Sequence, residues 1–505
     1  MKTTLPAAPF AIACCFVALA STALPAQADS GKVSPWITAA VADGGSTEIL
    51  VVLSEQADLR SASAVPELSA RRRAVRDALW ETAQRSQQAL RARLDAAGVP
   101  YRSFSIVNAL HIPNAGAALV AELAARPDVA RIEANPRTRR ALPQPSAGSK
   151  AGQLESVEWN VSLIRAPEMW AAGHTGQGIV VGNQDTGFDW SHPALKQQYR
   201  GWNGTSADHD YSWHDAIHSG GGVCGPDSPT PCDDYGHGTL TVGVSIGDDG
   251  GANKIGVAPG ARWIGCRNME QGWGTPATYL ECLEFFLAPY PVGGTPAQGN
   301  PAMAPDVTNN SWTCPPDEGC SWDTLQAAIE AQRAAGIMTV VAAGNDGPSC
   351  STVQDPPAIY DAAFSVGATD SGDGISSFSG RGPVAIDGSG RMKPDICAPG
   401  DNIRSSAPGG DYAAASGTSL AAPHVAGAVA LLWSASPALR GRIDLTEQAL
   451  ARSAVDLYST ECGDPGDAVP NNVYGWGRLD AMAAHWIFGD GFETGAPWAW
   501  STMVP

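Results

Sequence analysis

The stretch "GTSLAAPHVAGAVALL" (residues 417–432) places a serine at the start of a long run of small and apolar residues. Ala, Val and Leu recur without leaving a polar face, a pattern typical of a helix buried inside a core. A serine at a helix start is either a cap or a nucleophile beside free backbone N–H groups. Residues 417–421 also nearly match the G-x-S-x-G turn of α/β-hydrolases. The role of Ser419 therefore depends on the rest of the chain.

The larger part of the chain alternates short apolar runs with helix-like segments. The predicted strands fall within residues 178–185, 262–269, 305–312, 336–344 and 363–370, and a helix is predicted over 324–336. Continuous apolar strands separated by helices favour an α/β fold with a mostly parallel sheet flanked by helices. Active sites of such folds lie at the carboxyl ends of the strands. Polar residues occur there, namely Asp185, Asn310, Ser311 and Asn345.

A different pattern precedes this domain. Strands are predicted at 47–55, 102–113 (a pair) and 129–140, with helices at 67–97 and 116–127. The order β-α-β-β-α-β predicts a small α+β domain over residues 47–140. Residues 29–46 are interpreted as a linker. Residues 141–158 are interpreted as an exposed, cleavable linker, since 137–155 are rich in Arg, Pro, Ser and Gly.

The chain begins with a segment typical of export. Lys2, an apolar run over 11–20 and Ala26-Gln27-Ala28 predict a signal peptide over residues 1–28 and a secreted protein. Nine cysteines follow it, and disulfides are expected rather than a zinc site because the spacings lack clustered histidines. The nearest neighbours form three plausible pairs: Cys224 with Cys232, Cys266 with Cys282, and Cys314 with Cys320. Cys350, Cys397 and Cys462 leave one odd thiol.

Charge excludes one class of partner. The chain has a formal net charge of −19, with 16 Lys and Arg against 12 Asp and Glu in residues 29–150 and 15 against 39 in residues 151–505. An acidic body does not suit nucleic acid, whose binding needs basic surface. Apart from the signal segment, no stretch has the roughly 18 uninterrupted apolar residues that span a membrane. We expect neither nucleic acid nor membrane as a partner, and we expect a monomer.

Three residues together fit nucleophilic catalysis. Asp185 ends an apolar strand, His237 lies at an apparent helix start, and Ser419 opens the apolar helix. A serine hydroxyl becomes a strong nucleophile when a histidine takes its proton and a carboxylate orients that histidine. Taken singly, each has an ordinary structural interpretation, as a capping Asp, a loop His and a capping Ser.

The sequence around the three residues resembles the subtilisin-like serine proteases. The segments "DTGFDWSHPAL" (185–195), "GHGTLTVGV" (236–244) and the opening stretch occur in that family's order Asp, His, Ser. Further similar segments are "GVAPGA" (256–261), "VVAAGNDG" (340–347), "FSVGAT" (364–369), "SSFSGRGP" (376–383) and "KPDICAPG" (393–400). The resemblance covers about residues 159–485.

This resemblance implies a set of roles. Asp185 would orient His237, His237 would act as base and acid, and Ser419 would attack. Asn345 and the backbone N–H of Ser419 would stabilise the oxyanion. Two segments would bind the substrate backbone: Ser311, Trp312 and Thr313, and Ala342, Ala343 and Gly344.

The resemblance also implies a domain plan and a function. The catalytic domain would cover residues 159–487, followed by a tail (488–505) without an assigned role, and the α+β domain would be a propeptide that inhibits until it is cut away within residues 137–158. The function implied is that of a secreted serine endopeptidase made as an autoprocessed zymogen, acting on proteins or peptides. No cofactor is expected; the family often binds structural calcium, but no calcium ligands are matched here. The Asp- and His-rich residues 208–218 are interpreted as a solvated loop rather than a metal site.

Three other interpretations compete. Asp185-Thr186-Gly187 and Asp370-Ser371-Gly372 are both D-[T/S]-G triplets and would suit an aspartic protease. That interpretation leaves His237, Asn345 and Ser419 unexplained. An α/β-hydrolase would use Ser419, Asp444 or Asp480, and His485, but only 86 residues follow Ser419. A catalytically inactive binding protein would be expected to lack one of the four site residues, and all four are present.

Overall fold

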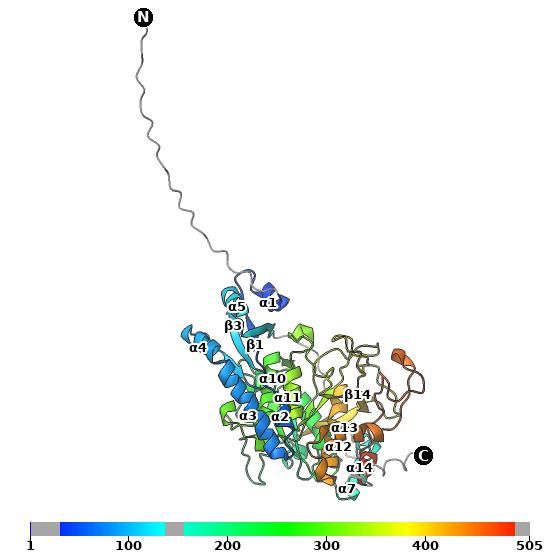
Figure 1. Ribbon diagram of the computed structural model, residues 1–505. Coiled ribbons are helices and arrows are strands. Elements are labelled where there is room, and N and C mark those ends of the chain that lie inside the picture. Colours follow the sequence, from blue (N-terminus) through cyan, green and yellow to red (C-terminus); the bar gives the residue numbers. More distant parts are fainter. Residues whose placement is uncertain (2–30, 137–155, 490–505) are drawn as a thin grey trace.

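The computed structural model describes residues 31–136 and 156–489, together with Met1. The predicted signal peptide, most of the predicted cleavable linker and the tail from residue 490 lie outside the described residues. The described chain forms a small N-terminal domain, blue to cyan in Figure 1, that lies against a larger α/β domain. The α/β class predicted from the alternating pattern is confirmed.

A seven-stranded sheet forms the centre of the larger domain. Every neighbouring pair of its strands is parallel, in the order β15-β14-β13-β12-β6-β9-β7. The strands are β15 (Ile396–Pro399), β14 (Phe364–Thr369), β13 (Met338–Ala342), β12 (Val307–Asn310), β6 (Val180–Asp185), β9 (Arg262–Arg267) and β7 (Trp213–Asp215). Parallel strands all end at the same edge, so Asp185 and the residues after β12 and β13 are brought to one side of the sheet.

Helices cover both faces of this sheet. On one face, α9 (His237–Ile246) and α12 (Thr418–Ala435) pack on the strands and on each other. On the other face lie α10 (Pro276–Leu287) and α11 (Gln326–Ala334). The C-terminal helices α13 (Ile443–Ser453) and α14 (Ala481–Gly489) pack together beside α12. The strands have apolar residues on both faces because both faces are covered.

Helix α12 includes residues 418–432 of the stretch "GTSLAAPHVAGAVALL", and Gly417 is its N-cap. Every residue from Thr418 to Trp433 is buried, which explains why the sequence has no polar face. Among the described residues, it is the one helix long and apolar enough to cross a membrane, but 89% of it is buried inside the protein. It is therefore the core helix that its sequence predicts.

The N-terminal domain has the predicted order of elements. Its antiparallel sheet runs β2-β3-β1-β4, formed by β1 (Ser46–Leu53), β2 (Arg102–Phe104), β3 (Ala109–Gly116) and β4 (Val129–Ala134). The long predicted helix is divided into α3 (Leu68–Ser86) and α4 (Gln88–Ala96), and α5 (Ala117–Ala124) precedes β4. The prediction that residues 29–46 are only a linker is wrong. They include α1 (Pro35–Ala40), which buries Ile37 completely and is followed by buried Val41, so the core of the domain begins earlier.

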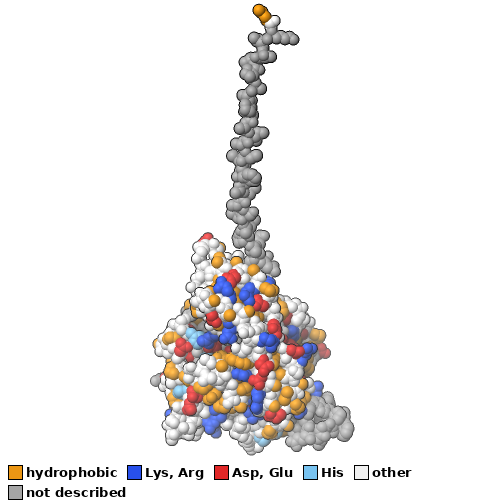
Figure 2. Space-filling model, turned by 60° about the vertical axis from the view of Figure 1, so that its left-hand side comes forward, with side chains coloured by type: hydrophobic (Ala, Val, Ile, Leu, Met, Phe, Trp, Pro, Cys, Tyr) orange, Lys and Arg blue, Asp and Glu red, His pale blue; other side chains and the backbone are white. Residues whose placement is uncertain are grey.

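Arginines of the N-terminal domain contact acidic residues of the larger domain. Helix α3 packs against α11, and its Arg72, almost fully buried, donates to Asp306 at 2.9 Å. Arg102 forms an ion pair with Glu281 on α10. Figure 2 shows basic and acidic side chains interspersed over the face it views, rather than gathered by domain. Basic side chains of the N-terminal domain therefore contact acidic side chains of the larger domain at the interface.

Four disulfides join the described cysteines. Three are the predicted pairs, Cys224–Cys232, Cys266–Cys282 and Cys314–Cys320. The fourth, Cys350–Cys462, spans 112 residues, and buried Cys397 is left as the free thiol. Burial raises the pKa of that thiol, so it is unreactive in the folded protein.

Removing the long disulfide should reduce the stability of the protein more than removing a short one. In the chain-entropy account, removing Cys350–Cys462 costs about 5 kcal/mol, because a long loop is closed, and removing Cys314–Cys320 costs about 2 kcal/mol. Double Cys→Ser variants at each pair should show this order in the free energy of unfolding by guanidinium. Equal losses, or a larger loss for the short bridge, would contradict the entropic explanation.

Candidate active site

A buried hydrogen bond joins the first two predicted catalytic residues. Asp185 is the last residue of β6, and His237 is the first residue of α9. The Nδ1 atom of His237 lies 2.7 Å and 2.9 Å from the two carboxylate oxygens of Asp185. Neither side chain is more than 1% exposed. The Nε2 atom of His237 has no hydrogen-bond partner in the described part of the chain.

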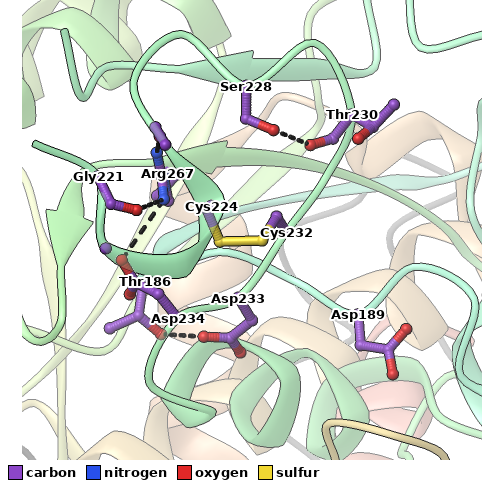
Figure 3. Close-up of a disulfide and its surroundings, with 12 residues drawn as sticks. Thr186, Asp189, Gly221, Cys224, Ser228, Thr230, Cys232, Asp233, Asp234 and Arg267 are labelled. Atoms are coloured by element: carbon purple, nitrogen blue, oxygen red, sulfur yellow. Dashed lines mark hydrogen bonds and ion pairs between the residues drawn. A yellow bond between two sulfur atoms is a disulfide. The ribbon is translucent and has the colours of Figure 1, made fainter. Parts of the chain in front are cut away.

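Asp233 holds this histidine helix against the strand that carries Asp185. Its carboxylate accepts hydrogen bonds from Thr186 Oγ1 (2.9 Å), Gly236 N (2.8 Å), and Thr239 N and Oγ1 (2.9 and 2.6 Å). Figure 3 shows Asp233 and Thr186 facing each other. The carboxylate thus satisfies N–H groups at the start of α9, which the helix itself leaves without partners. Burial raises the pKa of Asp233.

A close backbone contact joins the same two segments. Gly187 has a φ of 111°, and a Cβ at this position would lie 1.8 Å from the carbonyl oxygen of Cys232. Only glycine allows that approach. The Cys224–Cys232 disulfide, drawn in Figure 3, closes the segment immediately before Asp233. The glycine of the Asp185 triplet is therefore required by contact with the histidine segment.

A buried arginine anchors the residue next to Asp233. Arg267, at the end of β9, binds both carboxylate oxygens of Asp215 at 2.9 and 2.7 Å. It also lies 3.4 Å from the carboxylate of Asp234, a contact drawn in Figure 3. Burial raises the pKa of Asp234 to about 6, although Arg267 and the N–H of Gln271 favour its charged form. The loop that precedes His237 is thus attached to two strands of the sheet.

Ser419 lies in the first turn of α12 and is 3% exposed. Its hydroxyl donates to the carbonyl oxygen of Ser311 at 3.0 Å, and the Ser311 hydroxyl donates to the carbonyl oxygen of Ser419 at 2.7 Å. The structure thus places Ser419 beside the end of β12. Its hydroxyl is not hydrogen-bonded to His237 in this conformation.

Asn345 is fixed beside the serine by its own carbonyl group. The Oδ1 atom accepts from Thr418 N and from Thr418 Oγ1, both at 2.9 Å. Because Oδ1 is occupied by Thr418, the Nδ2 group is available to donate to another acceptor. The side chain is exposed, so an incoming group can reach it.

A cavity of about 270 Å³ borders Ser419 and Asn345. Five of the six predicted substrate-binding residues line it: Ser311, Trp312, Thr313, Ala342 and Gly344. Ala343 does not line this cavity, and its predicted role in binding the substrate backbone stays a prediction. Its side chain is buried in the hydrophobic core and its N–H donates to Val366 of β14, because successive residues at the end of β13 point to opposite faces.

The residues of the competing interpretations lie elsewhere. Asp370 accepts hydrogen bonds from Gly372 N and Gly374 N within its own turn, while Asp185 binds His237. Asp444 pairs with Arg333, and Asp480 with Arg165. His485 lies 5.1 Å, ring centre to ring centre, from His174. These residues form local contacts of their own and do not complete a site around Ser419.

Residues 208–218 are not the solvated loop that was predicted. They include strand β7, and Trp213 and Asp215 are at most 5% exposed because Arg267 draws Asp215 inward. His214 and His218 both contact Glu281, at 2.7 and 3.0 Å. Among residues 31–136 and 156–489, no group of three or more His, Cys, Asp or Glu side chains is arranged to hold a metal ion.

Asp233 is a site residue that the sequence analysis did not single out. It stands four residues before His237 in "DDYGHGT". An aspartate at this distance is not in the N-cap position, which Gly236 occupies, so the capping pattern gives no signal for it. Two adjacent aspartates made the choice between Asp233 and Asp234 impossible from spacing alone.

The sequence of the chain is similar to those of known proteins. The sequence model of the subtilase family matches residues 176–477. The chain is 36% identical over 436 residues to Bacillopeptidase F of Bacillus subtilis (strain 168), a match that covers 82% of this chain and 28% of that protein. It is 31% identical over 331 residues to Subtilisin BL of Lederbergia lenta, covering 65% of this chain and 99% of that protein.

The two matches differ in extent. The match to Bacillopeptidase F covers 82% of the chain, more than the residues after Pro136 can supply, so it includes part of the N-terminal domain. This chain spans only 28% of the length of that relative.

The hydrogen bonds of Asp233 allow a prediction of how its substitution changes the reactivity of Ser419. Asp233→Asn replaces an acceptor of several hydrogen bonds by an amide with a single acceptor oxygen, so the start of α9 loosens and His237 is held less firmly. We expect the rate at which a fluorophosphonate labels Ser419 to fall at least about ten-fold, with a shifted pH dependence. Asp227→Asn, an exposed carboxylate within the same disulfide-closed segment, is the matched control. Unchanged labelling in Asp233→Asn would refute the positioning role.

Proposed function

Because the chain belongs to the subtilase family and is a serine endopeptidase, we propose that it cleaves peptide bonds with Ser419 as nucleophile, His237 as base and acid, and Asp185 as the orienting carboxylate. The observation that carries this proposal is the buried pair in which Asp185 binds Nδ1 of His237, while Nε2 has no hydrogen-bond partner among the described residues. That arrangement fixes the tautomer in which Nε2 accepts a proton.

The first chemical step starts from the resting serine. The Ser419 hydroxyl leaves the carbonyl of Ser311 by rotation about χ1 and donates to Nε2 of His237. As its oxygen attacks the substrate carbonyl carbon, the proton passes to His237. The Asp185 carboxylate stabilises the imidazolium that forms, and burial of both residues strengthens this interaction.

The negative charge on the substrate oxygen is stabilised by fixed donors. The Nδ2 group of Asn345 is available because Thr418 occupies Oδ1. The N–H of Ser419 lies in the first turn of α12, where N–H groups lack partners within the helix and the helix dipole favours an anion. Both donors are held in place before the charge develops, which is the basis of this kind of stabilisation.

The reaction finishes by hydrolysis of the acyl-enzyme. His237 gives its proton to the leaving amine, and the new amino terminus departs. A water molecule then gives a proton to His237 as its oxygen attacks the ester, and the serine hydroxyl is restored as the acid product leaves. No metal or cofactor takes part in these steps.

The N-terminal domain is proposed to be an inhibitory propeptide. Its loop after β2 is held by Glu284 of α10, which accepts from Ser105 N, Ser105 Oγ and Ile106 N at 2.6, 2.6 and 3.1 Å. Its end is held by Asn135, whose Oδ1 accepts from Ala277 N at 2.8 Å. Pro136, the last described residue of this domain, lies against Gly319, the neighbour of Glu318 in the cavity lining, which supports inhibition by occupation of the cleft.

The protein is proposed to be secreted and to act outside the cell. The predicted signal segment (1–28) supports it, as do four disulfides, which persist in oxidising compartments. Substrates are proposed to be proteins or peptides, with the propeptide as the partner in cis. The protein is proposed to act as a monomer.

Ser419→Ala tests the proposed nucleophile. Casein hydrolysis should fall to background, and fluorophosphonate labelling should be lost. Asn345→Ala should retain labelling but lose turnover by on the order of 10²–10³-fold, a magnitude known for such a donor in subtilisin itself. Casein hydrolysis that persists in Ser419→Ala would rule out the assignment.

Glu284→Ala tests the inhibitory docking. Three hydrogen bonds to one buried carboxylate are lost, so the processed N-terminal domain should dissociate about 10–100 times more readily. The readout is the activity that appears when the processed complex is diluted into a peptide substrate. Glu81→Gln on the exposed side of α3 is the control. An unchanged inhibition constant in Glu284→Ala would contradict the role of this contact.

A further inference from the structure

A proline interrupts the hydrogen bonding of the helix that carries Ser419. Pro423 lies inside α12, four residues after Ser419. In an α-helix each carbonyl accepts from the N–H of the residue four positions later, and proline has no N–H. The carbonyl of Ser419 therefore has no regular helical donor. Because both residues are buried, a donor within the protein must take its place.

The hydroxyl of Ser311 is that donor. Its Oγ lies 2.7 Å from the carbonyl oxygen of Ser419, and Ser311 is fully buried. A carbonyl oxygen can only accept, so the single hydroxyl proton of Ser311 points at Ser419. Ser311 directly follows β12, while Ser419 lies in the first turn of α12. A bond between helix and sheet thus replaces a bond within the helix.

The side-chain amide of Asn309 fixes the direction of this hydroxyl. Asn309 is 1% exposed, and its Nδ2 donates to Ser311 Oγ at 3.0 Å. Since the hydroxyl proton is already directed at Ser419, the Ser311 oxygen offers only lone pairs, which suit an N–H donor. The three groups form a buried chain in which Asn309 donates to Ser311 and Ser311 donates to Ser419.

The first turn of α12 is thereby held on two sides. Thr418 N donates to Asn345 Oδ1 at 2.9 Å, and the carbonyl of Ser419 is held by Ser311. The Ser419 hydroxyl, which rests on the Ser311 carbonyl, can then rotate toward a substrate while its own backbone stays in place. Such control matters because a misplacement of about 1 Å can cost on the order of 10²-fold in rate.

We propose that the Ser311 hydroxyl and Asn309 position the nucleophile: the hydroxyl takes the place of the helical N–H that Pro423 lacks, and Asn309 orients the hydroxyl. This inference rests on the proposed function, in which Ser419 attacks the substrate. The Ser311 hydroxyl and Asn309 act through the backbone of Ser419 and not on the reacting atoms. The role of the Ser311 hydroxyl is separate from the proposed contact of the Ser311 backbone with substrate.

Restoring the missing N–H tests the replacement. Ser311→Ala removes the donor but keeps the backbone carbonyl. In the processed enzyme, kcat for a peptide and the rate of fluorophosphonate labelling should therefore fall at least about ten-fold, with KM within about two-fold of wild type. Pro423→Ala supplies an N–H that can donate to the Ser419 carbonyl. In that background, the same Ser311→Ala change should lower both rates by less than about three-fold.

A second cycle of variants tests the orienting role of Asn309. Asn309→Leu, of similar size, removes the N–H that directs the Ser311 hydroxyl, so labelling should slow at least about three-fold. Because Asn309 acts through that hydroxyl, Asn309→Leu should have no further effect in a chain that already carries Ser311→Ala. Unchanged labelling in Asn309→Leu, or additive losses in the double variant, would overturn this role.

Ser434→Ala is the matched control on the same helix. The Ser434 hydroxyl donates to the Leu431 carbonyl at 2.7 Å, about four helical turns beyond Ser419. This variant should keep the wild-type kcat and labelling rate. A loss as large as that of Ser311→Ala would mean that any weakened contact of α12 has the same effect, and it would overturn the positioning role.

The remaining outcomes separate the inference from the function on which it rests. Equal losses from Ser311→Ala with proline or alanine at position 423 overturn the replacement. If Ser311→Ala does not fold, the double variant with Pro423→Ala decides, because its restored N–H should allow folding and labelling; a double variant that also fails overturns the inference. Casein hydrolysis that persists in Ser419→Ala, or a label that mass spectrometry finds on another residue, refutes the proposed function instead.

Discussion

The partly buried carboxylate of Asp233 is the constraint on which the site depends. It gathers donors from the turn after β6 and from the first turn of α9, so it fixes the distance between the segments that carry Asp185 and His237. A buried charge is costly unless it is surrounded by donors, and this one has at least four. The loop around Asp233 is held by a disulfide and by Arg267, and this restricts the positions that the His237 side chain can take.

The arrangement of the site also depends on the parallel sheet. Residues distant in the sequence, Asp185, Ser311 and Ala342, meet because their strands end at one edge. Helix α12 adds Ser419 to the same edge only because it is buried throughout and packs along the strands. The catalytic geometry is thus a result of the core, and the aspartate, histidine and serine need no direct covalent or local connection.

Much of this arrangement could be predicted from the sequence. Apolar runs predicted the central strands, and short cysteine spacings predicted three of the disulfides. The fourth bridge joins residues 112 apart, and no local pattern identifies such a pair. Strand β7 was missed because it has only three residues and because its Asp215 is buried by pairing with Arg267. The hydrogen bond from Ser419 to Ser311 is a rotamer choice, which sequence does not encode.

The long disulfide links the segment that carries Asn345 to a residue between α13 and α14. Cys350 follows Asn345 by five residues, and its partner is Cys462. During synthesis the chain emerges from its N-terminus, so this bridge cannot form until nearly the whole catalytic domain has been made. The segment that carries Asn345 therefore stays untethered on an unfinished chain. If Asn345 acts as proposed, the order of synthesis delays the completion of the active site until the chain has passed Cys462.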